Sequence, residues 1–145
     1  MNEYLPTLIF VAGCLQLGVL IASSLVPLRL NWKTSLAGLP RLHRQLYWIY
    51  GGYVVLAIIA NGLVCIINAG ELAAGSRLAR CVCGYLAIFW GVRLSLQTIL
   101  DVKEHLTTWW LHAGYHTLTV LFVSFTVFFG IVTWSARRLL QAVRR

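Results

Sequence analysis

The stretch "CVCGYLAIFWGVRLSLQTIL" (residues 81–100) decides the fold class, because it is twenty residues long and its one charged side chain is that of Arg93. An α-helix rises ~1.5 Å per residue, so twenty residues cover the ~30 Å of hydrocarbon in a bilayer. Charged residues make up 11% of the chain, against about 25% in a typical soluble domain. The stretch is therefore predicted to be a transmembrane helix, Cys81–Leu100, in a membrane protein.

Three further apolar stretches of similar length predict three further spans. They are Leu5–Val26, Tyr47–Asn68 and Leu111–Trp134. Because the connections are short, residues 1–145 are predicted to form a single all-α domain, a four-helix transmembrane bundle. In the tail (residues 135–145) leucine and valine alternate with arginines, which predicts a short basic amphipathic helix along the membrane interface. We expect a multi-pass integral protein, in the inner membrane of a bacterium.

The net charge of +8 indicates lipid headgroups and not nucleic acid. Eleven of the twelve basic residues lie in loops, tails or span ends, where anionic headgroups attract them. We call side B the side of the first and third loops, and side A the side of the termini and the second loop. Side B carries five basic residues and side A six, so the positive-inside rule leaves the orientation open. A dual-topology dimer would show the same balance.

Loop residues predict where the helices begin and end. Pro40 is suited to the first turn of a helix that runs on into the second span. Gly70, after Asn68, is expected to stop that helix, and Ser76 to cap the start of the next one.

The fourth span has two contrasting faces at helical spacing. In lipid, small and polar side chains favour contacts between helices, whereas large apolar ones face the acyl chains. We therefore expect the small and polar face, which includes His116, to point into the bundle. That face comprises His112, His116, Thr119, Val123, Thr126, Gly130 and Thr133, and the opposite face Leu111, Tyr115, Leu118, Phe122, Phe125 and Phe129.

The third span carries two stripes at the same spacing. One is a groove of small residues that predicts a close neighbour, and the other is polar and descends toward side B. The groove comprises Gly84, Gly91, Ser95 and Thr98, and the polar stripe comprises Trp90, Arg93, Gln97, Asp101 and Glu104.

Arg93 is costly where it stands. A charged residue near the centre of a transmembrane helix costs about 2.5–3.5 kcal/mol on insertion. Snorkelling toward side B would lower this cost, but helix side chains lean toward the helix N-terminus, which for this span is on side A. No predicted span contains an Asp or Glu. Neutral groups within the chain serve five guanidinium donors poorly: Gln97, Gln16, Asn61, freed backbone carbonyls or stacking on Trp90. We expect an acceptor from outside the chain: a lipid phosphate, a carboxylate, a quinone carbonyl, an inorganic anion or an acid on a partner subunit.

The polar residues gather in the membrane half on side B. At ~1.5 Å per residue, Arg93 lies about 4 Å from the midplane, and Gln97 and His116 lie about 9–10 Å from it. This distribution predicts a pocket that opens toward side B and binds an amphipathic ligand by its head. The predicted ligand-binding residues are Trp90, Arg93, Gln97, His116, Gln16, Asn61, Tyr47 and Tyr50. The alternative role of the Gln16 and Asn61 amides is hydrogen bonding between helices.

The histidines do not predict a haem or di-iron site. The first three spans contain no histidine, and His112 and His116 lie one turn apart on one helix, so they cannot ligate a haem from both faces. The i, i+4 spacing is nevertheless one that metal sites on helices use, and Glu104, His105 or His43 could complete an interfacial site. In the alternative, His112 anchors the helix at the headgroups and His116 bonds a neighbouring side chain. No cofactor or catalytic residue is assigned, and the cysteines are interpreted as small apolar residues.

The layout resembles that of two families, the small four-span bacterial protoporphyrinogen oxidases and the copper-resistance membrane proteins. The likeness lies in a basic loop followed by "RLHRQLYWIYGG" (residues 41–52). In those families a histidine in the first span matters, and "FVAGCLQLGVLIASS" (residues 10–24) has none. The resemblance therefore implies no activity for this chain.

Three classes of function fit the sequence. The first is a small membrane protein that binds a lipid, isoprenoid or quinone at Arg93. The second is a small transporter or channel that works as a homodimer, including one of dual topology. The third is an accessory subunit of a larger membrane complex in which Arg93 pairs with an acid of a partner. Whether the chain is an enzyme is left open.

Overall fold

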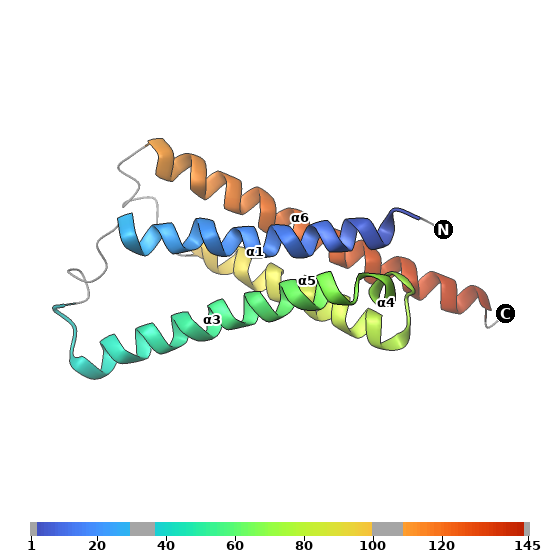
Figure 1. Cartoon of the computed structure of the whole chain (residues 1–145), viewed down its shortest axis with the longest axis horizontal. Coiled ribbons are helices and arrows are strands. Elements are labelled where there is room, and N and C mark those ends of the chain that lie inside the picture. The colour runs from blue at the N-terminus through green and yellow to red at the C-terminus, as the bar shows by residue number, and fades with distance from the viewer. Residues whose placement is uncertain (1–2, 30–36, 100–108, 144–145) are drawn as a thin grey trace. The chain divides into compact units, whose positions relative to one another are not determined.

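The computed structural model describes residues 3–29, 37–99 and 109–143, with side chains at 3–21, 37–99, 109 and 112–135. Every element in these ranges is a helix (Figure 1). The helices are α1 (Leu5–Arg29), α3 (Arg41–Ile67), α4 (Ala69–Ala73), α5 (Arg77–Ile99) and α6 (Trp109–Val143).

Three of these helices are long and apolar enough to cross a membrane: α3, α5 and the His112–Ser135 part of α6. This confirms the prediction of an all-helical fold whose helices include ones suited to cross a membrane. α1 has 25 residues, and its described apolar part is Leu5–Ile21.

The helix boundaries confirm two of the three expectations for the loops. α3 begins directly after Pro40, whose carbonyl oxygen accepts a hydrogen bond of 3.1 Å from the Arg44 N–H, and the helix continues into the second span. The Ser76 hydroxyl oxygen accepts a 3.1 Å hydrogen bond from the Ala79 N–H and so caps α5. The expected stop at Gly70 is wrong, because α3 ends at Ile67 and Gly70 lies inside α4.

The reversal between α4 and α5 falls at Gly75 instead. Gly75 has φ 70°, in the left-handed region that glycine adopts without steric cost. α4 begins directly after Asn68, whose carbonyl accepts a 2.9 Å hydrogen bond from the Leu72 N–H. The turn thus lies at the glycine that follows α4, whereas Gly70 is helical.

The separate amphipathic helix expected in the tail is also wrong. α6 runs as one helix of 35 residues from Trp109 to Val143. At ~1.5 Å per residue this is about 52 Å, which exceeds the ~30 Å of hydrocarbon. Its last turns therefore continue the same helix beyond the His112–Ser135 stretch that is long and apolar enough to cross a membrane.

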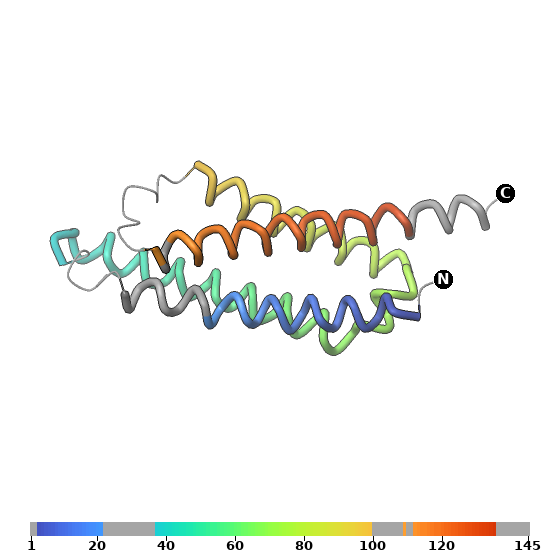
Figure 2. Tube along the Cα trace, turned by 90° about the horizontal axis from the view of Figure 1, so that it is seen from above, coloured from blue at the N-terminus to red at the C-terminus, as the bar shows by residue number. Residues whose placement is uncertain are grey.

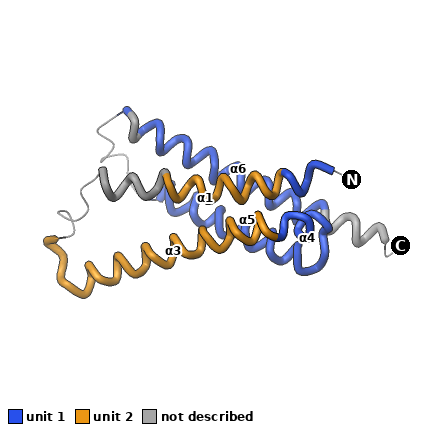
Figure 3. Tube along the Cα trace, viewed as in Figure 1, with its two compact units in different colours: residues 1–7, 68–145 blue, residues 8–67 orange. Residues whose placement is uncertain are grey.

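The chain divides into two compact units, which we describe separately (Figure 3). Unit 1 consists of Met1–Thr7 and Asn68–Arg145 and contains α4, α5 and α6. Unit 2 consists of Leu8–Ile67 and contains α3 and most of α1.

In unit 1, α5 and α6 lie side by side and antiparallel (Figure 2). A methyl group added to Gly91 would lie 3.6 Å from Thr126 Cγ2, and one added to Gly84 would lie 3.8 Å from Thr133 Cγ2. Both threonine hydroxyls donate 2.8 Å hydrogen bonds to the carbonyl four residues earlier in α6, so their methyl groups face α5. The glycine–threonine pairs repeat after seven residues, the repeat of helices packed along a common seam.

In unit 2, α1 and α3 approach more closely. A Cβ added to Gly13 would lie 2.9 Å from the Gly62 carbonyl oxygen, and one added to Gly62 would lie 2.8 Å from Leu17 Cδ2. The two backbones are therefore in direct contact at these glycines. Close approach at small residues is how helices gain dispersion energy in lipid, where no hydrophobic force drives them together.

The expectation for the faces of α6 is wrong. Phe122, Phe125 and Phe129 are buried, whereas His112 and His116 are exposed. The threonines of the small face are half-buried beside α5, so the buried seam runs between the two predicted faces. The physical reason is packing: the rings of Phe122 and Phe125 pack against the Trp90 indole of α5, and hydropathy does not rank two apolar faces in lipid.

Candidate functional site on α5

Trp90 is the centre of an aromatic cluster between α5 and α6. Its side chain is fully buried, with ring centroids 5.2 Å from Phe122 and 4.8 Å from Phe125. Phe89 stands at 90° to the indole at 5.4 Å. Such tilted and edge-on aromatic pairs add about 0.5–1.5 kcal/mol each beyond the area they bury. Trp90 therefore packs the two helices together, a role that the sequence did not assign to it.

The indole N–H of Trp90 is nevertheless unsatisfied. Nε1 is buried and has no hydrogen-bond partner among the described residues. A buried indole N–H normally finds an acceptor, because leaving it unpaired costs about 1–3 kcal/mol.

Arg93 lies one turn further along α5 and is half-buried. Its Nε is buried, and the described part of the chain provides neither a hydrogen bond nor an ion pair to it. Asp101 and Glu104, the acids of the predicted polar stripe, lie outside the described residues. Nε of the Arg93 guanidinium is thus an unsatisfied donor among the described residues.

Gln97 clamps α5 to α6. Its Nε2 donates hydrogen bonds to the Tyr115 carbonyl oxygen at 3.1 Å and to Thr119 Oγ1 at 2.8 Å. The Thr119 hydroxyl donates to the same Tyr115 carbonyl oxygen at 2.9 Å. The Tyr115 hydroxyl donates to the backbone carbonyl oxygen of Gln97 at 3.3 Å. The clamp thus ties a side-chain amide to the backbone of the facing helix.

The orientation of the Gln97 amide follows from its partners. The Tyr115 carbonyl can only accept a hydrogen bond, so the amide nitrogen and not the oxygen must face it. Oε1 therefore points away from the clamp, is buried, and lacks a donor among the described residues.

Three buried polar atoms on one stripe of α5 are thus unsatisfied by the described residues. They are the donors Trp90 Nε1 and Arg93 Nε and the acceptor Gln97 Oε1. Residues at i, i+3 and i+7 share one helix face, so the three atoms lie along about two turns. The predicted stripe on α5 carries this unmet hydrogen-bonding capacity.

His116 does not join this stripe through any described contact. It is exposed on α6, and its ring stands edge-on to that of Tyr115 at 5.7 Å. Gln97 bonds Thr119 instead, which lies three residues further along α6. No three His, Cys, Asp or Glu side chains gather within the described ranges, and Glu104 and His105 lie outside them.

The other four predicted site residues belong to unit 2. Gln16 and Asn61 are buried, and Gln16 Nε2 contacts Cys65 Sγ at 3.7 Å. Gln16 Oε1 and Asn61 Nδ2 have no partner among the described residues. Their alternative role, hydrogen bonding between helices, is met only by the weak contact to sulfur.

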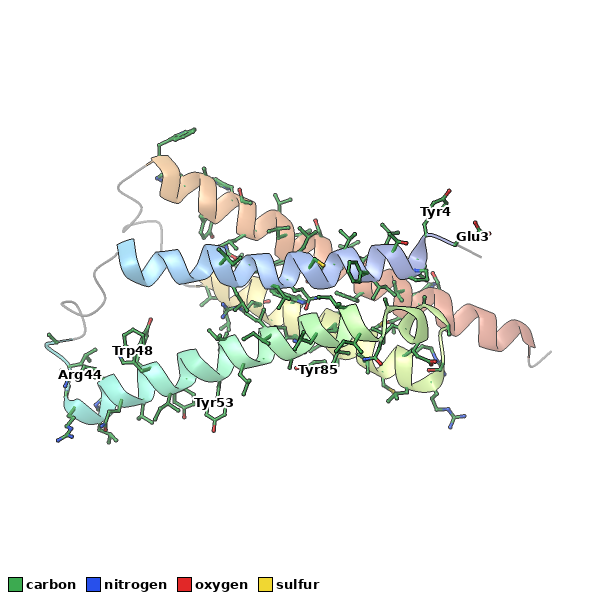
Figure 4. The ribbon with its side chains drawn as sticks, viewed as in Figure 1. Glu3, Tyr4, Arg44, Trp48, Tyr53 and Tyr85 are labelled. Atoms are coloured by element: carbon green, nitrogen blue, oxygen red, sulfur yellow. The ribbon has the colours of Figure 1, made fainter. Side chains whose placement is uncertain are left out.

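Tyr47 and Tyr50 are exposed near the start of α3. Their neighbours Trp48 and Tyr53 are exposed too, and project from the helix in Figure 4. Exposed aromatic rings beside basic residues are typical of a helix end at the headgroup level. The predicted site residues therefore form two sets, one in each unit.

The small-residue groove on α5 is occupied within the chain. Thr126 and Thr133 of α6 pack on Gly91 and Gly84, while Ser95 and Thr98 are exposed. The close neighbour that the groove predicted is α6 itself. The seven-residue repeat of Thr119, Thr126 and Thr133 against this groove was a signal in the sequence that could have paired the two helices.

No family model matches the chain, and neither a curated protein nor a solved structure matches it.

Proposed function

We propose that the protein is a small integral membrane protein that binds an amphipathic ligand by an anionic or carbonyl head at Arg93. The ligand is of the lipid, isoprenoid or quinone type. Trp90 and Gln97 contribute to the same site on α5. In this proposal α1 is a fourth span, and the four long helices form one transmembrane bundle.

The single observation that carries the proposal is the unpaired arginine. A guanidinium inside a membrane span costs several kcal/mol unless it is paired, and the described residues offer Arg93 no hydrogen bond or ion pair. Arginine binds carboxylate and phosphate through two parallel hydrogen bonds, which is the pairing that recovers most of this cost. A bound anion or carbonyl supplies it.

Unmet atoms on both sides of Arg93 support a bound molecule over a lone ion. Trp90 Nε1 lies one turn toward the middle of α5, and Gln97 Oε1 lies one turn toward its end. A ligand that satisfies all three atoms must extend along about two turns of the helix, as a lipid-like molecule does.

Native mass spectrometry of the full chain in mild detergent tests the proposal. We expect a defined adduct on the wild-type protein that is lost in Arg93→Leu, and its mass identifies the ligand class. Arg93→Lys keeps the charge but not the planar fork, so we expect it to retain only part of the adduct.

Arg77→Leu is the matched control. It removes one arginine from the same helix, at an exposed position in the first turn of α5. We expect the adduct to persist in this variant. Equal adduct on wild type and Arg93→Leu, with both folded, would overturn the proposal.

The same spectra test the other two classes of function. An adduct with the mass of a protein would indicate a partner subunit that supplies the acid. A dimer whose abundance depends on Arg93 and which carries no ligand would favour the transporter class.

A further inference from the structure

Resting on this proposed function, we infer that the ligand of α5 is an anionic lipid whose headgroup carries a free hydroxyl group. The inference follows from the order of donors and acceptors along the stripe. Read from Trp90 to Gln97, the helix presents a donor, a cationic donor and an acceptor. The complementary ligand presents an acceptor, an anion and a donor in that order.

Gln97 is the residue that discriminates between ligands with and without a hydrogen-bond donor. Its Nε2 is fixed against α6 by the Tyr115 carbonyl and Thr119, so the side chain can offer a ligand only Oε1. A buried carbonyl oxygen requires a donor. Quinones, fully ionised phosphate monoesters and simple carboxylates offer acceptors alone, so none of them satisfies Gln97 while it also binds Arg93.

The order of the three residues along α5 matches a lipid. Trp90, Arg93 and Gln97 follow one another toward Ile99, where α5 ends, so Gln97 lies nearest to this end and Arg93 lies one turn deeper.

A phospholipid places its groups in the same sequence. Its acyl chains point toward the midplane, the ester carbonyls come next, then the phosphate, and the headgroup hydroxyls are outermost. The ester carbonyl accepts from Trp90 Nε1, the phosphate accepts from Arg93, and a hydroxyl donates to Gln97 Oε1. Phosphatidylglycerol has this arrangement of groups.

The test compares two lipids of equal charge that differ in the hydroxyl. Phosphatidylglycerol and phosphatidylmethanol with identical acyl chains are titrated onto the full chain in mild detergent, with phosphatidylcholine as the zwitterionic reference. Binding is measured by native mass spectrometry. We expect wild type to bind phosphatidylglycerol about five-fold more tightly than phosphatidylmethanol, the ratio that one net hydrogen bond gives.

Two variants assign this ratio to Gln97. Gln97→Met removes the acceptor at similar volume, and we expect the two anionic lipids to bind it equally. Thr119→Val weakens the clamp but leaves Gln97 Oε1 in place, so we expect it to keep the preference. A preference that persists in Gln97→Met would overturn the assignment, and the wild-type comparison holds even if that variant does not fold.

The outcomes separate this inference from the function on which it rests. Equal binding of both anionic lipids to wild type, with both weakened at least ten-fold in Arg93→Leu, would overturn the hydroxyl recognition and leave anion binding at Arg93. Anionic lipids that bind Arg93→Leu as tightly as wild type would overturn both. Displacement of bound lipid by equimolar glycerol phosphate would show that the site binds a soluble phosphate equally well. It would overturn the inference that the ligand is a lipid.

Discussion

The two helix pairs use glycine in different ways. In the α5–α6 pair, Gly84 and Gly91 face threonine methyl groups at distances that would accommodate one more carbon atom. In the α1–α3 pair, Gly13 and Gly62 bring the two backbones into direct contact, and an added carbon would lie 2.9 Å or less from its neighbours. The first pair is therefore held by side chains that fill a groove, and the second by a closer contact in which an added methyl group would find no room.

The glutamines of the two helix pairs also differ, in the hydrogen bonds that they make between helices. Gln97 donates two short hydrogen bonds across the α5–α6 seam. Gln16, in the α1–α3 pair, makes only a contact of 3.7 Å to sulfur. The same residue type thus contributes differently at the two seams, because one amide reaches the facing backbone and the other does not.

The largest effect is expected from Trp90→Ala. The variant removes the ring that fills the space between α5 and the phenylalanines of α6, and we expect a loss of about 3–5 kcal/mol in the free energy of unfolding. Ile88→Ala, an exposed position on the same helix, should change it by less than about 0.5 kcal/mol. Unfolding in mixed micelles measures both, and equal losses would show that packing on Trp90 does not hold the pair.

A smaller effect is expected where backbones touch. Gly13→Ala drives a methyl group against the Gly62 carbonyl oxygen, and we expect it to cost about 1–3 kcal/mol. The cost should outweigh the gain of about 1 kcal/mol in helix propensity.

Gly91→Ala and Gly18→Ala are the matched substitutions for this comparison. The first meets a methyl group at 3.6 Å and the second meets nothing within 4 Å. Both should leave the protein unchanged or up to about 1 kcal/mol more stable. If Gly91→Ala were as harmful as Gly13→Ala, the distinction between the two seams would be lost.

The smallest effect is expected at the two glutamines. Gln97→Leu should cost about 1 kcal/mol, within the range measured for hydrogen bonds between helices in lipid. Gln16→Leu removes only a weak contact to sulfur and an unsatisfied oxygen, so it should be neutral or stabilising. The same unfolding titration compares the two variants, and a greater cost for Gln16→Leu would reverse our ranking of the two glutamines.

Of the residues on the α5 stripe, the sequence predicted the importance of Arg93 but not the role of Gln97. Arg93 was identified because a lone charge in an apolar helix is visible in one dimension, and the structure leaves it unpaired among the described residues. The role of Gln97 as a clamp was missed, because its partners Tyr115 and Thr119 lie on another helix and come together only in the packed pair. His116 was placed inward on the same face-sorting argument that misplaced the phenylalanines.

The sequence by itself determined what depends on neighbours along the chain. Apolar length predicted three helices that are long enough to cross a membrane, and the Ser76 hydroxyl predicted the start of α5. The absence of acids in the predicted spans indicated that no span offers Arg93 an ion pair. These features follow from helix rise, capping and charge, all of which are local.

Only the tertiary structure decided which faces meet. It buried Phe125 and exposed His116 on α6, and it placed the left-handed turn at Gly75 rather than stopping the helix at Gly70. In lipid, no hydrophobic force selects one apolar face over another, so the choice follows from how side-chain volumes fit across a seam. That fit is a property of two helices together and cannot be predicted from the sequence of either helix alone.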